Sequence, residues 1–265
     1  NNKLNDKNII ILGIESSCDD TSAAILINGE IKANIVASQD VHEKFGGVVP
    51  ELASRAHQQN IIPVVDAAII DAGIDKKDID AIAFTKGPGL LGSLIVGTCF
   101  AKSFALALNI PLVEVNHMQG HILAHFIKNE DDNYPTFPFI CMTVSGGHTQ
   151  LVIVKDYFEM EVIGETIDDA AGEAFDKAAK IMGIPYPGGP LIDKFAKEGD
   201  PKKYKFPISN LDGYNYSFSG LKTSILYFLQ KEMAKDDQFI EINKADICAS
   251  YQATIIKSLF KKLVK

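Results

Sequence analysis

The chain repeats one order of predicted elements, and this repeat constrains its fold more than any other feature. Each half begins with three apolar strands separated by polar turns, and a long helix follows the third strand. The predicted strands lie at 9–14, 22–27 and 31–38 in the first half and at 137–144, 151–154 and 160–163 in the second. The predicted helices lie at about 50–72, where Pro63 predicts a kink or a break, and at about 169–182. Such a duplication predicts two similar α/β lobes.

The first turn of each half is serine-containing and either charged or rich in glycine. One runs from Glu15 to Thr21 and the other from Ser145 to Gln150. Backbone N–H groups and hydroxyls in such turns can bind an anion. If the two turns face each other across a cleft, they form a clamp for a polyphosphate or an adenylate, as in actin-like ATPases and sugar kinases. Two ordinary tight hairpins are the alternative, but the position of both turns after buried strands favours the clamp.

Two histidines lie four residues apart after a further predicted strand at 112–115. If His117 opens a helix, this spacing places the imidazoles of His117 and His121 on one face, where two neutral nitrogens can bind one metal ion. Two ligands are too few for a complete site. A zinc endopeptidase would carry a glutamate as general base directly after the first histidine, and Met118 occupies that position. The pair therefore indicates a metal site that is not of the protease type.

Three carboxylates crowd the first turn, at Glu15, Asp19 and Asp20. Like charges placed so closely repel, so we expect them to be kept apart, bound to a metal or catalytic. A solvated turn is the simpler explanation for any one of them. Because the turn follows a buried strand in the predicted cleft, we assign a functional role to Asp19.

A second group of acids opens the helix predicted at 169–182. Asp168 and Asp169 suit the positive N-terminal end of a helix dipole. Asp176 lies two turns further on, where it faces water or a ligand. The segment at 187–190, Pro-Gly-Gly-Pro, then precedes another predicted helix, and its glycines let the backbone approach a ribose or an adenine closely.

Two further predicted helices begin with weaker signals. Gly-Pro-Gly-Leu-Leu-Gly at 87–92 leads into an apolar helix at 90–108 but lacks the Gly-Lys-Ser/Thr of a P-loop. Gly89, Gly92 and Gly97 allow either close helix packing, which we favour, or a ligand near the helix N-terminus. Ser219 is predicted to be the N-cap of another helix.

Charge and cysteine content narrow the class of protein. The formal net charge of −8 does not indicate a nucleic-acid binder, although lysines cluster at 202–205 and 257–265 and a basic patch can lie on an acidic protein. The four cysteines form no Cys-x-x-Cys, which indicates reduced thiols. No signal-peptide pattern is found and no apolar run approaches a membrane span, so we expect a cytoplasmic protein without a membrane partner.

Taken together, the motifs closely resemble those of the TsaD family, whose members transfer a threonylcarbamoyl group to tRNA and were once described as O-sialoglycoprotein endopeptidases. The resemblance covers nearly the whole chain and rests on the segments 13–21, 46–55, 117–121, 145–150, 168–177 and 187–190. It implies an α/β, two-lobed actin-like ATPase fold (ASKHA, a duplicated RNase H-like fold). We place the lobes at 1–115 and 116–265.

The resemblance also implies a reaction. L-threonylcarbamoyl-adenylate would donate its threonylcarbamoyl group to N6 of the adenosine 3′ of the anticodon in tRNAs that read ANN codons, with release of AMP. The cofactors implied are one divalent metal ion per subunit, Fe2+ with Zn2+ and Mg2+ as alternatives, and an ATP-type nucleotide in the cleft. The partners implied are tRNA, a TsaB-like paralogue that meets the helix near 51–72 and a TsaE-like ATPase, and a homodimer is left open.

The site residues implied by the resemblance form three groups. His117 and His121 match the metal ligands. Asp19, with Glu15 and Asp20 near it, matches the acidic turn that faces the metal, and we assign these three residues to catalysis. The residues that match the substrate site are Thr143, Val144, Ser145, Gly146, Gly147, Asp176, Gly189 and Asp193.

The sequence departs from the family in one respect. The family continues beyond Lys265 with a nucleotide segment and an aspartate that is the third metal ligand. We therefore expect the second lobe to lack its C-terminal part, the metal site to be incomplete and activity to be weak or absent. The other functions left open are a zinc metalloendopeptidase, an actin-fold ATPase or sugar kinase, and a scaffold within a complex.

Overall fold

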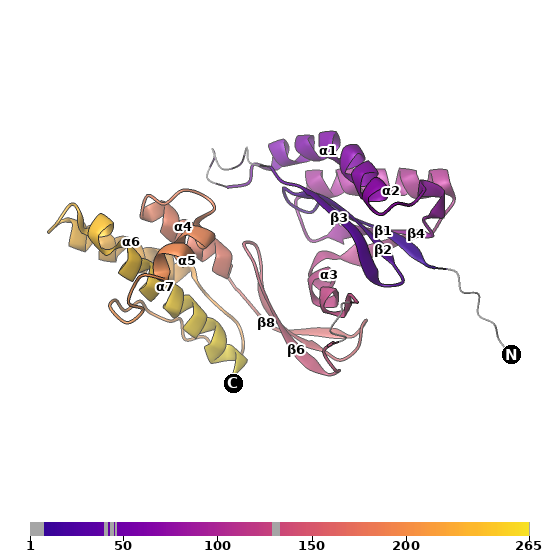
Figure 1. Cartoon of the computed structure of the whole chain (residues 1–265). Coiled ribbons are helices and arrows are strands. Elements are labelled where there is room, and N and C mark those ends of the chain that lie inside the picture. The colour runs from indigo at the N-terminus through magenta and orange to yellow at the C-terminus, as the bar shows by residue number, and fades with distance from the viewer. Residues whose placement is uncertain (1–7, 40–41, 43–44, 46, 129–132, 265) are drawn as a thin grey trace. The chain divides into compact units, whose positions relative to one another are not determined.

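The chain divides into two compact units, Asn1–Pro135 and Thr136–Lys265 (Figure 1). The computed structural model describes residues 8–39, 42, 45, 47–128 and 133–264. Of the segments singled out in the sequence, Gly46 and Lys265 lie outside the described residues. Each unit is described by itself.

The first unit is built on a five-stranded sheet with the strand order β3-β2-β1-β4-β5. Strands β1, β2 and β3 are antiparallel neighbours, whereas β1, β4 and β5 run parallel to one another. The strands are β1 Ile10–Glu15, β2 Thr21–Ile27, β3 Glu30–Ala37, β4 Ala81–Gly87 and β5 Leu112–Asn116. The helices are α1 Pro50–Asp71, α2 Leu91–Leu108 and α3 His117–Leu123, with 3-10 turns η2 Lys76–Asp78 and η3 Ala124–Phe126.

Alternating side chains of the central strands form the core of this unit. Leu12 of β1 and Ile25 of β2 are completely buried, and they cluster with Ile61 of α1. Helices α1 and α2 lie side by side over the sheet in Figure 1. Helix α1 begins at Pro50, whose missing N–H suits a first turn, and it continues through Pro63, so the predicted break there is absent.

Helix α3 belongs to the first unit because it packs against β4 and β5. The sequence placed the boundary between residues 115 and 116, and the compact units divide later, between Pro135 and Thr136. The reason is local: β5 runs directly into α3 without a linker.

Helix α2 differs from the sequence expectation in one respect. Among the described residues it is the one helix that is long and apolar enough, by length and composition, to cross a membrane. Length and composition are weak grounds for a membrane span. The helix also turns small buried residues, Gly97 and Ala101 among them, toward the rest of the unit and packs against α1 and β4.

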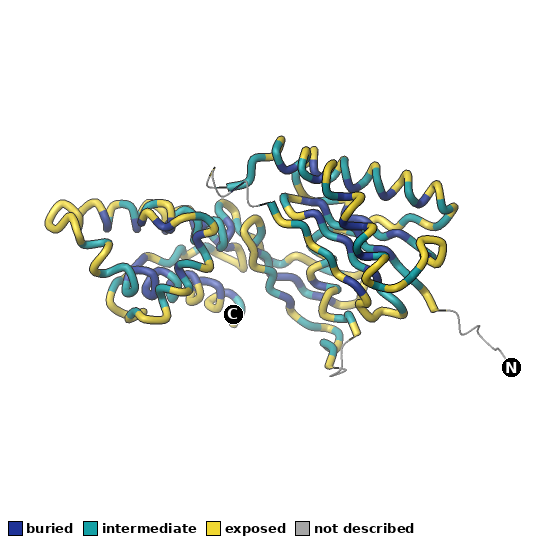
Figure 2. The backbone as a smooth tube through the Cα atoms, turned by 45° about the horizontal axis from the view of Figure 1, so that its top comes forward, coloured by how far each residue is buried: buried dark blue, intermediate teal, exposed yellow. Residues whose placement is uncertain are grey.

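The second unit joins a three-stranded antiparallel sheet, in the order β6-β7-β8, to four helices. Its elements are β6 Phe139–Val144, β7 Thr149–Val154, β8 Met160–Glu165, α4 Ala171–Ile181, α5 Gly188–Ala196, α6 Ser219–Met233 and α7 Phe239–Leu263. Its core contains large buried side chains, including Tyr216, Phe218 and Tyr251. Buried positions recur along α7, the helix that ends at the C-terminus in Figure 2, because this helix packs along α5.

The predicted repeat is confirmed at the start of each unit. Strands β1, β2 and β3 followed by α1 correspond to β6, β7 and β8 followed by α4. The units differ after that point. In the described part of the second unit, no counterparts of the parallel strands β4 and β5 follow the helix.

Candidate metal and substrate site

The predicted histidine pair lies at the start of α3, directly after β5. The Asn116 side chain accepts hydrogen bonds from the N–H groups of Met118 and Gln119 at 2.9 and 3.2 Å. This cap makes His117 the first residue of the helix. The Nε2 atoms of His117 and His121 lie 3.2 Å apart, so the i,i+4 spacing brings the two nitrogens to one place.

Glu15, the last residue of β1, supports His117 at its other nitrogen. The Glu15 Oε2 atom lies 3.2 Å from His117 Nδ1. The same carboxylate accepts hydrogen bonds from the Thr85 hydroxyl and the Ser17 N–H. Burial raises the pKa of Glu15, but these hydrogen bonds, first that with His117, outweigh burial and lower the pKa to about 2. An ionised Glu15 accepts the Nδ1 proton of His117, which leaves the Nε2 lone pair directed toward His121.

The separation of the two nitrogens fits a shared metal ion. With metal–nitrogen bonds of about 2.0–2.1 Å and bond angles between roughly 90° and 109°, two ligand nitrogens lie about 2.8–3.4 Å apart. The observed 3.2 Å falls in that range. The pair supplies two ligands, and within the described residues no group of three or more His, Cys, Asp and Glu side chains is placed to hold an ion. The metal site therefore stays a prediction for which two ligands are well placed.

The other two acids of the first turn occupy different surroundings from Glu15. Asp19 is half-buried and Asp20 is exposed. Partial burial, and then the negative charge of Asp19, raise the pKa of Asp20. The structure thus brings Glu15 into contact with His117, while Asp19 and Asp20 follow in the outer part of the turn.

The glycines at the start of α2 allow the first turn to sit close to this helix. A Cβ atom on Gly89 would lie 2.4 Å from the Ser17 carbonyl oxygen, and one on Gly97 would lie 2.2 Å from Ser16 Oγ. Both distances are too short for any side chain. The packing explanation of these glycines is therefore confirmed.

The corresponding turn of the second unit is ordered by Ser145. Its hydroxyl accepts hydrogen bonds from the N–H groups of Gly147 and His148 at 3.3 and 3.0 Å. The N-terminus of α4 lies against this turn, because Gly172 N–H donates to the Ser145 carbonyl at 3.1 Å and a Cβ on Gly172 would lie 2.7 Å from that oxygen. Thr143, just before the turn, has a buried hydroxyl without a partner among the described residues.

The predicted nucleotide residues lie on α4 and α5. Asp176 Oδ1 accepts a hydrogen bond from Gly188 N–H at 2.8 Å, so Asp176 satisfies the N-terminus of α5. Gly189 has room beside it, because an added Cβ would meet only Phe175 Cβ at 3.9 Å. Asp193 accepts from Gln252 Nε2 at 3.0 Å. Asp176 therefore has a structural partner that the sequence did not indicate, while Gly189 has an open side.

Asp168 supports a different helix from the one that the sequence suggested. Its carboxylate accepts hydrogen bonds from the hydroxyls of Ser217 and Ser219 and from the N–H groups of Phe218 and Ser219. These bonds cap α6, whose first residue is Ser219, whereas α4 begins later, at Ala171. The prediction that Ser219 is itself the N-cap is wrong, because the capping carboxylate comes from a segment distant in sequence.

Some supporting residues were not singled out from the sequence. Thr85, near the end of β4, bonds the Glu15 carboxylate, and Asn116, the last residue of β5, caps α3. Polar residues at the ends of parallel strands often mark a site. His57 of α1 is completely buried beneath the first turn. The only sequence signal for His57 was a histidine among apolar residues on one helix face.

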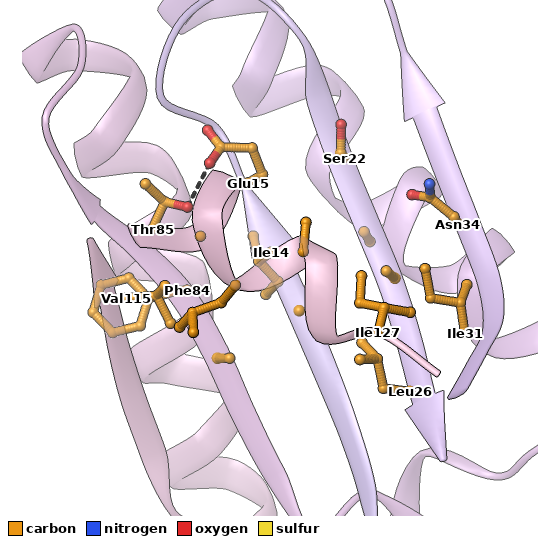
Figure 3. A pocket seen from close by; sticks show the side chains of 17 residues that line it. Ile14, Glu15, Ser22, Leu26, Ile31, Asn34, Phe84, Thr85, Val115 and Ile127 are labelled. Carbon is orange, nitrogen blue, oxygen red and sulfur yellow. Dashed lines mark hydrogen bonds between the residues drawn. The ribbon is translucent and has the colours of Figure 1, made fainter. Parts of the chain in front are cut away.

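A cavity of about 490 Å³ lies in the first unit beside Glu15 (Figure 3). Its lining is mostly apolar, with Leu26, Ile31 and Ile127 at one end. Glu15 and Thr85 border its other end, where a hydrogen bond joins them. The cavity therefore reaches the carboxylate that supports His117.

The family model and the relatives described next carry the same name and cover most of this chain. The family model described as TsaD, tRNA N6-adenosine threonylcarbamoyltransferase, matches residues 30–265. The tRNA N6-adenosine threonylcarbamoyltransferase of Christiangramia forsetii is 68% identical over 262 residues, which are 99% of this chain and 77% of that protein. The enzyme of the same name from Cytophaga hutchinsonii is 63% identical over 96% of this chain and 74% of that protein.

One solved structure supports the fold. Component A of the (R)-2-hydroxyglutaryl-CoA dehydratase from Acidaminococcus fermentans is similar with a TM-score of 0.53, over 97% of this chain and 78% of that one. The sequence identity is 16%, so this similarity concerns the fold alone. It agrees with the predicted actin-like α/β fold.

Proposed function

Because this chain belongs to the TsaD family of tRNA N6-adenosine threonylcarbamoyltransferases, we propose how its own residues carry out that family's reaction. The protein is an acyltransferase that places a threonylcarbamoyl group on N6 of an adenosine in tRNA. We propose that the donor is L-threonylcarbamoyl-adenylate. The observation that carries the proposal is the pair of facing imidazole nitrogens with the Glu15 carboxylate behind one of them.

We propose that His117 and His121 hold one divalent metal ion. Imidazole ligands suit Fe2+ or Zn2+ better than Mg2+, which prefers oxygen. A bound ion would polarise the threonylcarbamoyl group toward attack. Glu15 keeps His117 in the tautomer whose Nε2 atom can coordinate, which is the usual role of a carboxylate behind a metal-binding histidine.

We propose that Asp19 orients the attacking amine and accepts its proton. The donor is a mixed anhydride and is already activated, so no nucleophilic side chain is required. The amine nitrogen forms a bond to the carbamoyl carbon, the bond from that carbon to the phosphate oxygen breaks, and AMP leaves with the electron pair. A carboxylate within reach of the amine removes the proton. Glu15 and Asp20 add negative charge to the same turn.

The second unit is proposed to bind the adenylate. The Ser145 and Gly147 N–H groups hold the exposed turn together, and a further backbone N–H of such a turn can stabilise phosphate charge. Among the described residues no hydrogen bond uses the Gly146 N–H, so this group is available to the phosphate of the adenylate. Asp176 fixes Gly188, and the open side of Gly189 leaves space for a ribose or an adenine.

We propose that a TsaB-like paralogue binds to α1 and α2. Several large apolar side chains of these two helices are exposed, including Ile62, Ile70, Leu91, Ile95 and Leu106. Exposed apolar side chains that gather on neighbouring helices are typical of a protein interface. Leu106→Glu should abolish co-elution with the paralogue on size exclusion, and unchanged co-elution would contradict this surface. A TsaE-like ATPase and a homodimer stay predictions, and a cytoplasmic location is proposed because tRNA is the substrate.

The proposed function is tested by transfer of labelled threonylcarbamoyl from synthetic adenylate to tRNA. With the C-terminal segment that the resemblance predicts after Lys265, the protein should label tRNA and release AMP, whereas a tRNA lacking the adenosine 3′ of the anticodon should stay unlabelled. His117→Ala with His121→Ala should remove both transfer and bound metal, as measured by elemental analysis. Full transfer by the double variant would refute the role of the pair. Peptide cleavage and sugar-dependent ATP turnover should both be absent. These activities would indicate the endopeptidase and the sugar kinase that the sequence left open as alternatives.

A further inference from the structure

A buried histidine of α1, His57, contacts the acidic turn on both sides of Asp19 and Asp20. His57 is completely buried. Its Nε2 atom lies 3.0 Å from the Cys18 carbonyl oxygen, and its Nδ1 atom lies 2.7 Å from the Thr21 hydroxyl. Cys18 directly precedes Asp19, and Thr21 directly follows Asp20. One imidazole ring therefore holds the backbone before the two carboxylates and the side chain after them.

The partners of His57 determine how its ring is protonated. A carbonyl oxygen can only accept a hydrogen bond, so Nε2 carries the proton that binds Cys18. In the neutral ring Nδ1 then carries no proton and accepts the hydrogen bond that the Thr21 hydroxyl donates. Both ring nitrogens are satisfied in a neutral imidazole, and His57 has no donor or acceptor left for a substrate. Its contribution to the reaction is therefore made through the turn.

Helix α2 holds the same backbone from a second direction. The Ser93 hydroxyl also donates to the Cys18 carbonyl, at 2.9 Å, and the Ser16 hydroxyl donates to the Ser93 carbonyl at 3.0 Å. The Leu90 N–H donates to the Ser17 carbonyl at 2.7 Å. The turn is fixed on its buried side, and this fixes where Asp19 and Asp20 can project.

We infer that His57 is a positioning residue for the transfer reaction, which it serves by holding Cys18 and Thr21 so that Asp19 faces the attacking amine. This inference rests on the proposed function. Displacement of a catalytic group by about 1 Å can lower a rate on the order of 10²-fold. A loosened turn should therefore lower kcat more than it raises KM for tRNA.

The chain offers variants that separate positioning from general stability. His57→Leu removes both hydrogen bonds, whereas His57→Gln restores a donor for Cys18 and an acceptor for Thr21 with its side-chain amide. Thr21→Val removes one of the two bonds at nearly constant volume. Ile61→Ala is the matched control, because Ile61 is a buried residue of the same helix that belongs to the core cluster.

The test measures kcat, KM for tRNA, the thermal midpoint and the alkylation rate of the exposed Cys18 thiol in the intact protein. His57→Leu should lower kcat about 10- to 100-fold and speed the alkylation of Cys18, because the turn moves more freely. Thr21→Val should act in the same direction, His57→Gln should recover most of the kcat, and Ile61→Ala should lower the thermal midpoint with little change in kcat or alkylation.

Two results would overturn the inference. One is an unchanged kcat in His57→Leu and Thr21→Val, and the other is a Cys18 alkylation rate that no variant at position 57 alters. If His57→Leu does not fold, Thr21→Val and His57→Gln decide the question. A protein that carries the predicted C-terminal segment and still lacks transfer activity would instead refute the proposed function, and the alkylation rates would still test whether His57 holds the turn.

Discussion

The first turns of the two units share a framework and differ in what they present. In both, the strand after the turn begins with a buried threonine that binds the helix following the third strand. Thr21 binds the His57 side chain of α1, and the Thr149 hydroxyl accepts a hydrogen bond from the Ala171 N–H of α4 at 2.9 Å. The first turn carries three carboxylates, whereas the second carries serine, glycine and His148 and no carboxylate.

This difference teaches how one supersecondary unit can support two kinds of chemistry. Side chains from α1 and α2 hold the first turn, so its own carboxylates are left for a metal, an amine or His117. The second turn is held mainly through its backbone and the Ser145 hydroxyl, and among the described residues the Gly146 N–H is the backbone donor of this exposed turn that no hydrogen bond uses. The first turn suits cations and proton transfer, and the second suits a phosphate.

The largest expected effect removes a metal ligand beside the first turn. His117→Ala should lower the transfer rate on the order of 10³-fold, because the loss of metal assistance costs several kcal/mol of transition-state stabilisation. Transfer should be measured with saturating adenylate and tRNA, with bound metal determined in parallel. His125→Ala is the control, since His125 lies in η3 and, among the described residues, its hydrogen bond is with the Ile122 carbonyl oxygen. Equal losses in both variants would contradict the site.

A smaller effect is expected when the second turn is displaced without any change of charge. Gly172→Ala places a Cβ atom 2.7 Å from the Ser145 carbonyl and 2.8 Å from Gly146 N, so the turn has to move. We expect kcat/KM for the adenylate to fall about 10²-fold, with bound metal unchanged. Gly220→Ala is the matched control, because an added Cβ there meets nothing within 4 Å. A normal kcat/KM in Gly172→Ala would contradict the proposal that this turn binds the adenylate.

Glu15→Gln should separate support of the metal from catalysis. The amide keeps the size of the carboxylate but loses its charge, so His117 is a poorer ligand. Loss of such a supporting partner typically lowers metal affinity about 10- to 100-fold. Competition with a chelator measures this affinity directly. If affinity is unchanged while transfer falls, Glu15 acts on the substrate and belongs with Asp19 in its role.

The sequence predicted the repeat, the succession of three strands and a helix at the start of each half, and the histidine pair, because these depend on local patterns. Apolar strands, turn residues and i,i+4 spacing are properties of neighbouring residues. The predicted ends of helices were less accurate. Asp168 was assigned to the helix that follows it, but it caps α6, about fifty residues later in the chain. Local propensity could not reveal this, because the same carboxylate suits either helix start.

The supporting residues of the first turn were missed for a similar reason. The bonds between His57 and Cys18 and between Ser93 and the same carbonyl join segments far apart in sequence. No spacing rule connects them until α1 and α2 are packed on the sheet. The carboxylates and the histidines could be predicted from their residue types, but the side chains that hold them become evident only in the fold.

The smallest predicted effect concerns stability, and it tests whether the second unit also depends on a carboxylate. Burial raises the pKa of Asp168, but its hydrogen bonds with Ser217, Phe218 and Ser219 outweigh burial and lower it. A lowered pKa stabilises the fold above the unfolded value of about 3.9, and this stabilisation is lost as pH falls through the folded pKa. Asp168→Asn should therefore cost about 1 kcal/mol or less at pH 7, as is typical of a helix cap.

The cost of Asp168→Asn should shrink as the pH is lowered, because protonation of Asp168 in the wild-type protein removes the same charge. Urea unfolding of the two proteins at pH 7, 5 and 3.5 measures this convergence. Asp236→Asn, a change of the same type in an exposed turn after α6, is the control and should have a smaller effect. A difference between wild type and Asp168→Asn that stays constant down to pH 3.5 would mean that shape, and not charge, makes this cap. Neither the Ser145 turn nor the cap of α6 would then depend on the charge of a carboxylate. The second unit would differ more clearly from the first, whose turn carries three carboxylates.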